Sequence, residues 1–172
     1  MSRAKPFHAE RYQLRAAAPG LPALLLVPIA RLAAGDLGRA FAGIDPWASY
    51  PYPADVLAAY FAASEPSAPR YSIDIGGTVA GVVGLRLDWL RGPYLQFLGL
   101  LPGYQRLGLG GTVLAWIEAE AGPASRNLWV CASDFNAAAI RFYEHQGFQR
   151  IATLDGLVKD GRDEVLLRKK LT

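Results

Sequence analysis

The sequence predicts an α+β (mixed α/β) fold, in which a central, mostly antiparallel and twisted sheet of about seven strands is flanked by about four helices. Short apolar stretches separated by Gly and Pro turns open the chain, which is typical of antiparallel hairpins. The second half instead alternates strand and helix patterns. The 172 residues are 52% hydrophobic and 19% charged. This composition excludes a disordered or fibrous protein and suits one compact domain over residues 1–172.

The first part of the chain predicts two strands followed by two helices. Residues 11–17 and 23–29 have strand patterns and are joined by a Pro- and Gly-rich turn. Asp36 is the expected cap of a short helix. Three prolines then interrupt any regular structure, and Pro53 suits the first turn of a second helix that continues to Ala63.

The second part predicts a hairpin and then alternating strands and helices. Gly76 and Gly77 join the two strands of the hairpin. In the second of these strands Leu85, Leu87 and Trp89 alternate with charged residues, which indicates one buried face. Strands are predicted at residues 71–75, 78–90, 94–101, 127–132, 149–154 and 164–171, and helices at residues 112–120 and 136–146.

Charge and cysteine content limit the partners and the location that we expect. The net charge is only +3, and the one basic run, Arg168–Lys170, is expected to be a solvated tail, so no nucleic acid or membrane partner is predicted. The apolar stretch 21–34 is shorter than the ~20 residues that span a bilayer, so no targeting or membrane segment is predicted. The single cysteine, Cys131, rules out an internal disulfide and suits the cytoplasm.

The segment Gln105-Arg106-Leu107-Gly108-Leu109-Gly110 lies between a predicted strand and a predicted helix. Its glycines permit positive φ and leave backbone N–H groups open, and the next helix adds the positive end of its dipole. We expect a phosphate site here, although a plain tight turn has the same pattern. Val113 replaces the third glycine of a dinucleotide-binding motif, and no Gly-Lys-Ser/Thr sequence occurs, so neither an oxidoreductase nor a nucleotide-triphosphate enzyme is predicted.

A second motif lies in the helix predicted at residues 136–146. Asn136 and Tyr143 are seven residues apart, close to two helical turns, so their side chains share one face and can serve one site. Three alanines between them keep that face thin enough for a long ligand. The alternative is that Tyr143 is a core aromatic and the alanines only favour the helix.

Together these motifs resemble those of the GNAT superfamily of N-acyltransferases. The family's loop reads Gln/Arg-x-x-Gly-x-Gly/Ala at the start of a helix, and its later helix, with an asparagine, a tyrosine and a terminal Gly-Phe, is similar to residues 136–148. The resemblance covers about residues 71–171. It implies a GNAT-like domain that takes acetyl-CoA as the acyl donor and uses no metal.

The resemblance also implies which residues contact acetyl-CoA. The pyrophosphate would lie on the backbone N–H groups of the glycine loop, and the pantetheine arm along the strand at Leu98 and Leu100. Arg106 would contact a phosphate or face solvent, and Thr112 would contact a phosphate or cap its helix. The implied donor site is Leu98, Leu100, Gln105, Arg106, Leu107, Gly108, Leu109, Gly110, Gly111, Thr112, Asn136, Ala139 and Tyr143.

In the family the tyrosine at this place is commonly the general acid, so Tyr143 is expected to protonate the CoA thiolate. No general base is identified, because the two positions where relatives carry a glutamate hold Tyr94 and Cys131. A water molecule is one substitute for the base. Cys131 is expected to be a small buried hydrophobe, with an acyl-enzyme nucleophile as the alternative.

The acceptor pocket is expected where the family match is weakest. Four aromatic residues, Trp47, Tyr50, Tyr52 and Trp89, are candidates for a stiff apolar wall, or else they fill the core beneath a long loop. The predicted function is direct transfer of an acetyl group to a primary amine on a small molecule or peptide. The alternative is a non-catalytic acyl-CoA binding or sensing domain. A homodimer is left open.

Overall fold

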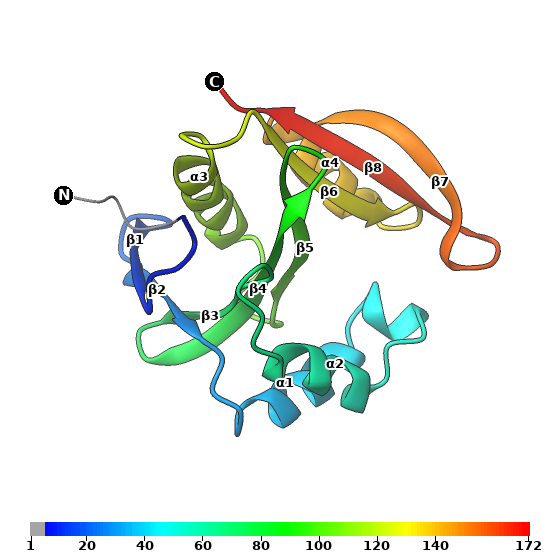
Figure 1. The fold of residues 1–172 in the computed structure, drawn as a ribbon. Helices are drawn as coiled ribbons and strands as arrows, with labels where there is room; N and C mark the ends of the chain where they lie inside the picture. Colours follow the sequence, from blue (N-terminus) through cyan, green and yellow to red (C-terminus); the bar gives the residue numbers. More distant parts are fainter. Residues whose placement is uncertain (1–5) are drawn as a thin grey trace.

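The structure is a computed structural model that describes residues 6–172. Its centre is one sheet of eight strands in the order β1-β2-β3-β4-β5-β6-β8-β7, so the predicted mixed sheet is confirmed (Figure 1). The overall figure of about seven strands was one too low, although each of the eight strands lies at a predicted stretch. The strands are β1 (Tyr12–Ala16), β2 (Ala23–Pro28), β3 (Arg70–Ile75), β4 (Thr78–Trp89), β5 (Gly92–Leu100), β6 (Asn127–Ser133), β7 (Gln149–Lys159) and β8 (Arg162–Lys170).

Within the described residues, four α-helices and one short 3₁₀ helix flank this sheet. They are α1 (Ala34–Ala42), η1 (Trp47–Ser49), α2 (Ala54–Ala62), α3 (Leu109–Ala121) and α4 (Ala137–His145). Asp36 is not the cap of α1, as the sequence had suggested, because the cap position falls on Ala33. Asp36 instead lies in the first turn, where it pairs with Arg39 and faces the positive end of the helix. No helix within residues 6–172 is long and apolar enough to cross a membrane.

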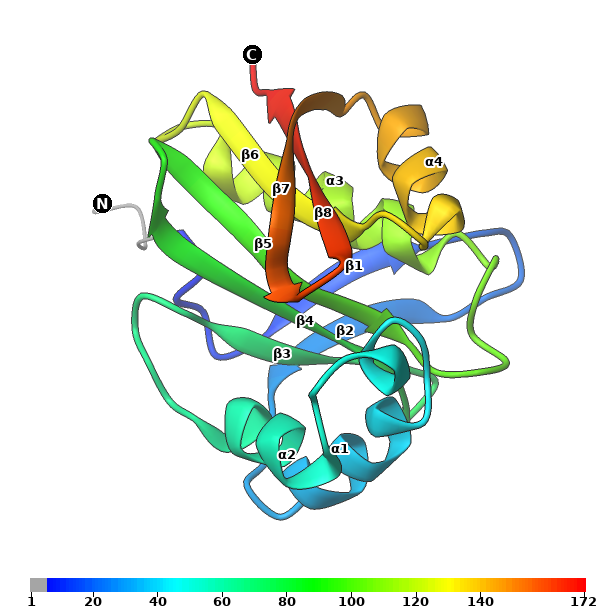
Figure 2. The same cartoon turned by 90° about the vertical axis from the view of Figure 1, so that its right-hand side faces the viewer.

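The helices bury two separate cores, one on each face of the sheet. On one face, α3 and α4 pack on a cluster that includes Val83, Leu114 and Ile140. On the other face, α1 and α2 pack over Val82 and Phe97. Val82 and Val83 are neighbours on β4 and point to opposite sides, as side chains of a strand must. Figure 2 shows α1 and α2 separated by the sheet strands from α3 and α4.

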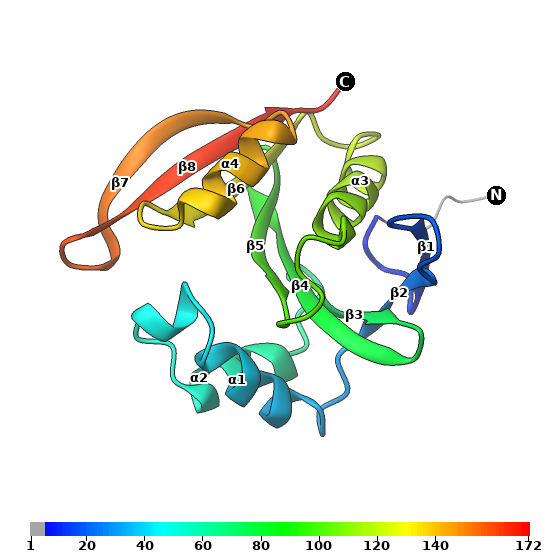
Figure 3. The ribbon, with the colours of Figure 1, turned by 180° about the vertical axis from the view of Figure 1, so that it is seen from behind.

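The pairing between β5 and β6 is the unusual feature of the sheet. Among the described strands it is the only parallel pair, and its register includes just Tyr94 with Trp129 and Leu95 with Val130. All other neighbouring strands are antiparallel and pair over longer stretches. Beyond Leu95 the two strands diverge, as Figure 3 shows. Residues 96–100 of β5 therefore keep β4 as a neighbour on one side and have no other described strand paired on the other side.

The last hairpin is longer than the sequence indicated. β7 continues to Lys159, whereas the predicted strand stopped at Leu154. The Asp155-Gly156 dipeptide reads as a turn, but the true turn lies at Asp160 and Gly161, where Lys159 pairs with Arg162. The irregular register between Leu154 and Lys159 absorbs the glycine inside the strand.

Candidate functional site

The glycine loop has the open backbone that an anion site needs. Gly108 takes φ +82° at the N-terminal cap of α3, and Arg106 takes φ +60°. A side chain at Gly108 would place its Cβ 3.3 Å from the carbonyl oxygen of Ala17, so conformation and space both favour glycine. Within residues 6–172, the N–H groups of residues 105–108 have no hydrogen-bond acceptor. They lie beside the first-turn N–H groups of the 13-residue helix α3, which a helix leaves free.

The side chains of the loop play different parts. Gln105 and Arg106 are exposed, and the Gln105 amide nitrogen donates to the carbonyl oxygen of Leu100 over 3.2 Å. Leu107 is exposed, whereas Leu109 is fully buried in the core and can offer only its backbone. The Thr112 hydroxyl is buried and donates to the carbonyl oxygen of Gly108 over 3.3 Å, so Thr112 is not the helix cap.

The two remaining glycines bring α3 close to α4. A Cβ on Gly110 would lie 3.0 Å from the ring of Phe142, and one on Gly111 would lie 3.5 Å from the side chain of Gln146. The start of α3 therefore packs directly on α4, which carries the second motif. This contact fixes the glycine loop relative to Asn136 and Tyr143.

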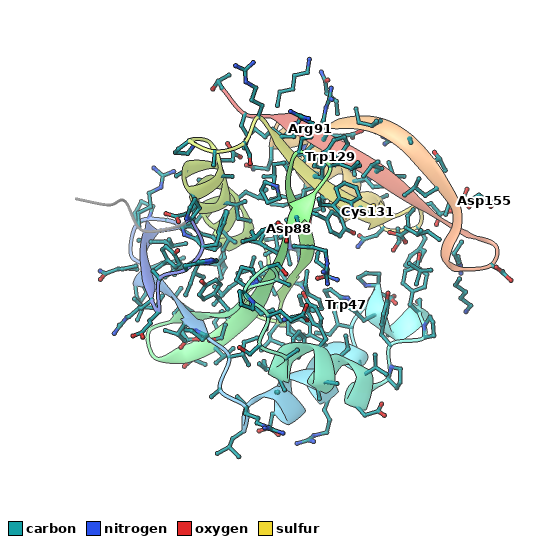
Figure 4. All side chains as sticks on the ribbon, viewed as in Figure 1. Trp47, Asp88, Arg91, Trp129, Cys131 and Asp155 are labelled. Atoms are coloured by element: carbon teal, nitrogen blue, oxygen red, sulfur yellow. The ribbon has the colours of Figure 1, made fainter. Side chains whose placement is uncertain are left out.

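The diverging strands enclose a cavity of about 330 Å³. β5, β6, α4, α2, the η1 region and the β7–β8 hairpin all contribute to its wall, and Figure 4 labels Trp47 and Cys131, which line it from η1 and from β6. The lining residues are Pro46, Trp47, Tyr50, Tyr52, Val56, Leu57, Tyr60, Tyr94, Leu95, Gln96, Phe97, Leu98, Val130, Cys131, Ala132, Ser133, Asn136, Ala139, Tyr143, Val158 and Glu164.

The second motif faces this cavity as its spacing predicts. Asn136, Ala139 and Tyr143 all line it, together with Leu98 of the free edge of β5. Asn136 also caps α4, because its side-chain oxygen accepts a hydrogen bond from the N–H of Ala139 over 3.1 Å. Leu100 lies outside the cavity wall.

Tyr143 is held protonated by its surroundings. It is 7% exposed and packs against the rings of Phe142 and Phe148, at centroid distances of 5.2 and 5.5 Å. Burial raises the pKa of Tyr143 well above the ordinary phenol value. The group therefore keeps its proton at neutral pH and enters a reaction in its protonated form.

The aromatic residues expected to bind the acceptor divide into two groups. Trp47, Tyr50 and Tyr52 line the cavity. Trp47 also stacks on Phe97, with ring centroids 4.3 Å apart and planes 17° from parallel, so it is both cavity wall and core packing. Trp89 lies apart from the cavity, where it stacks on Tyr94 at 4.8 Å and supports that ring from behind.

Cys131 is half-buried in the cavity wall. Burial raises the pKa of its thiol, and a hydrogen bond with Tyr94 lowers it by less. The thiol form therefore dominates at neutral pH, which disfavours a nucleophilic role. Burial also raises the pKa of Tyr94 far above its usual range. These two residues occupy the positions where the resemblance would place a carboxylate.

A carboxylate that sequence reasoning missed enters the cavity from β8. Glu164 is 6% exposed, lies opposite Ser133 of β6, and accepts a hydrogen bond from the Tyr50 hydroxyl over 2.5 Å. Burial and Glu164 together raise the pKa of Tyr50 to about 12. In the sequence Glu164 follows Arg162 and Asp163 and looks like part of a solvated turn. Its only sequence signal is that a buried apolar run begins directly after it.

Three further acidic residues, Asp88, Asp134 and Asp155, lie outside the cavity. Asp88 is near the end of β4 and Asp155 is on the outer strand β7, and neither lines the cavity. Asp134 follows β6 and does not line the cavity. Within residues 6–172 no group of three or more His, Cys, Asp or Glu side chains is arranged to hold a metal ion.

The fold and this site match one family. The chain belongs to the acetyltransferase (GNAT) family, whose model matches residues 36–148, and the resemblance read from the two motifs is thereby confirmed. Acetyl-CoA-dependent N-acetylation is the general reaction of the family. No curated protein matches the chain.

Solved structures with the same fold have diverged widely in sequence. An acetyltransferase from Thermus thermophilus is 20% identical with a TM-score of 0.71, over 86% of this chain and 97% of that one. The ribosomal-protein-S18-alanine N-acetyltransferase of Escherichia coli is 18% identical with a TM-score of 0.68, over 87% and 94%. A spermidine N-acetyltransferase from Vibrio cholerae, in complex with CoA and spermine, is 15% identical with a TM-score of 0.68, over 86% and 95%.

Proposed function

We propose that this protein is an N-acetyltransferase that moves the acetyl group of acetyl-CoA directly to a primary amine, with Tyr143 as the general acid. One observation carries the proposal. Tyr143, Asn136 and Ala139 meet the free edge of β5 in a single cavity, and the start of α3 packs against the helix that bears them. A phosphate site and a proton donor are thus joined by an unpaired strand edge.

The donor site follows from the free backbone groups. The N–H groups of residues 105–108 and of the first turn of α3 would hold the pyrophosphate, with Arg106 free to reach a phosphate from its exposed position. Residues 96–100 of β5 would hold the pantetheine amides by main-chain hydrogen bonds, as another strand would. The donor supplies an acetyl group activated as a thioester.

The chemistry asks two things of the protein. It must hold the amine against the acetyl carbon within the cavity, and it must protonate the departing sulfur. Tyr143 serves the second need because its buried phenol stays protonated. Trp47, Tyr50 and Tyr52 serve the first need as an apolar wall facing the acceptor.

The second candidate is a non-catalytic acyl-CoA binding or sensing domain. The observation behind it is that Tyr94 and Cys131 occupy the two positions where relatives carry a glutamate. An assay of thiol release from acetyl-CoA against amines, antibiotics and short peptides separates the two. Turnover of an amine is the expected result. No thiol release with any acceptor, together with a higher melting temperature in the presence of acetyl-CoA, would favour the sensor. No melting shift at saturating acetyl-CoA would contradict both.

A further inference from the structure

Glu164 is the one ionisable acid or base, among Asp, Glu, Lys, Arg and His, in the described wall of the cavity. Its Oε1 atom accepts the hydrogen bond of Tyr50, and within residues 6–172 its Oε2 atom takes none. Burying a carboxylate costs several kcal/mol unless a cation or donors compensate it. One phenol supplies a single donor, so the carboxylate has capacity left for a ligand.

No cation in the part of the chain that the structure describes fills that capacity. Arg162 begins the same strand, but its guanidinium lies over the ring of Phe135, 4.9 Å from the centroid. Arg70 and Arg86 pair with Glu65 elsewhere in the fold. The groups around Glu164 are the phenols of Tyr50, Tyr52 and Tyr94 and the Cys131 thiol, all of which have raised pKa values and are neutral at neutral pH. A cationic ligand is the partner that this site lacks.

We propose that Glu164 binds the ammonium group of the acceptor and takes its proton, and that the acceptor is a monoamine on an apolar or aromatic body without a carboxylate. This inference rests on the proposed function. It places the base on β8, opposite Ser133, and not on β5 or β6, where the resemblance to relatives would place a glutamate.

The wall chemistry defines the class of acceptor. Rings from Trp47, Tyr50, Tyr52 and Tyr94 line the cavity with Glu164 as the one carboxylate of the described wall, which suits one cation attached to a flat or apolar group. A carboxylate on the acceptor would meet Glu164 with no cation in the described wall to balance it. A second ammonium would be buried without a counter-charge. The cavity of about 330 Å³ also has to admit the thioester end of the donor, which favours a small acceptor.

The protons balance in this scheme. The ammonium gives its first proton to the Glu164 carboxylate, which passes it to solvent. The neutral nitrogen then bonds to the acetyl carbon as the carbon–sulfur bond breaks. Tyr143 gives its proton to the sulfur and regains one from the same nitrogen. The products are an amide, a free thiol and one proton in solution.

The first test compares matched acceptors with the wild-type protein. Phenylethylamine is expected to exceed phenylalanine, which differs only by a carboxylate, at least about 100-fold in kcat/KM. It is also expected to exceed its analogue with a second aminomethyl group on the ring. Comparable rates for either competitor would overturn the inferred acceptor class and leave the proposed function standing. No turnover of any amine would overturn both.

The second test is Glu164→Gln, with Asp163→Asn on the same strand as the matched control. Glu164→Gln is expected to lower kcat/KM for phenylethylamine by about 100-fold or more, while acetyl-CoA still raises the melting temperature. The control is expected to keep wild-type activity. Glu164→Asp keeps the carboxylate on a side chain one methylene shorter, and its kcat/KM is expected to fall about 10-fold. This variant covers the case in which the glutamine variant does not fold. Wild-type rates in these variants would refute the role of Glu164.

A substrate with a weakly basic nitrogen separates proton transfer from binding. The ammonium of β,β-difluorophenylethylamine is more acidic, so much of this amine is already neutral near pH ~7 and needs no base. With this difluorinated amine, Glu164→Gln is expected to lower kcat/KM by less than about 10-fold. An equal loss for both amines would show that Glu164 only positions the acceptor, and would overturn its role as the base.

Discussion

At the scale of single residues, burial shifts the pKa of several groups around the cavity. Burial raises the pKa of the Tyr143 phenol, because the charged form would lose hydration. Burial also raises the pKa of the Cys131 thiol, so this candidate nucleophile is a poor one. Glu164 lies among these groups and accepts a direct hydrogen bond from the Tyr50 hydroxyl.

Tyr143→Phe tests the general-acid role without changing the packing. Turnover is expected to fall by about 100-fold or more, because the departing thiolate would have to be protonated by water. The melting shift caused by acetyl-CoA is expected to stay nearly unchanged, since the ring remains. Steady-state kinetics and thermal unfolding measure both quantities. Tyr12→Phe, outside the cavity, is the matched control and should keep full activity; similar rates in both variants would rule out the assignment.

The residue scale is also where sequence reasoning reached its limit. Asn136 and Tyr143 could be assigned to one face because a helix has a fixed period, and both do line the cavity. Glu164 could not be found in this way. Its burial depends on pairing with Ser133 of β6 and on contact with Tyr50, 114 residues away, and neither is encoded locally.

At the scale of elements, local signals predicted most of the helices and strands. The turn predicted from Asp155-Gly156 was wrong because this polar dipeptide lies inside a strand. The cap predicted at Asp36 was wrong because this residue lies in the first turn of its helix. The divergence of β5 from β6 was also beyond prediction, because the two strand patterns continue for several residues past the last pair. Where two neighbouring strands separate depends on the side chains that pack between them.

The glycine loop makes a testable claim about backbone conformation. Gly108→Ala is expected to lower the free energy of unfolding by about 1–2 kcal/mol, because a Cβ disfavours φ +82°. It should also weaken acetyl-CoA binding, since the nearby N–H groups would turn. Gly20→Ala is the matched control, with φ +84° and no described atom near the new Cβ. Chemical denaturation and calorimetric titration would show whether donor affinity falls only at Gly108; an equal fall in both variants would contradict the phosphate site.

At the scale of the whole molecule, the sheet is two packed halves joined at a narrow contact. Antiparallel pairing holds β1 through β5 together, and likewise β6 with β8 and β7. Two backbone residue pairs, the packing of α3 and a few side-chain hydrogen bonds, among them those from Trp129 to Leu90 and from Tyr50 to Glu164, connect these halves. The cavity lies where the connection ends, so both halves contribute to it.

Phenols with raised pKa values make the molecule sensitive to alkali. Burial raises the pKa of Tyr60 to about 12 against the opposing Arg70, and raises that of Tyr50 to about 12. A folded-state pKa above the unfolded value near ~10 stabilises the native state below pH ~10. This contribution is lost as the pH rises toward 12. We expect tyrosinate absorbance to rise together with unfolding in that window. Independent titration of all tyrosines near pH ~10 in the folded protein would contradict it.

The order of the site residues along the chain also affects what happens when segments are exchanged between family members. Three rings of the aromatic wall, from Trp47, Tyr50 and Tyr52, come before β5, whereas the donor loop, Tyr143 and Glu164 follow it. An exchange of the first seventy or so residues between family members would therefore transfer an acceptor wall and leave the donor site in place. The hydrogen bond from Tyr50 to Glu164 crosses that division. A chimera would keep its amine recognition only when both sides of this bond are inherited together.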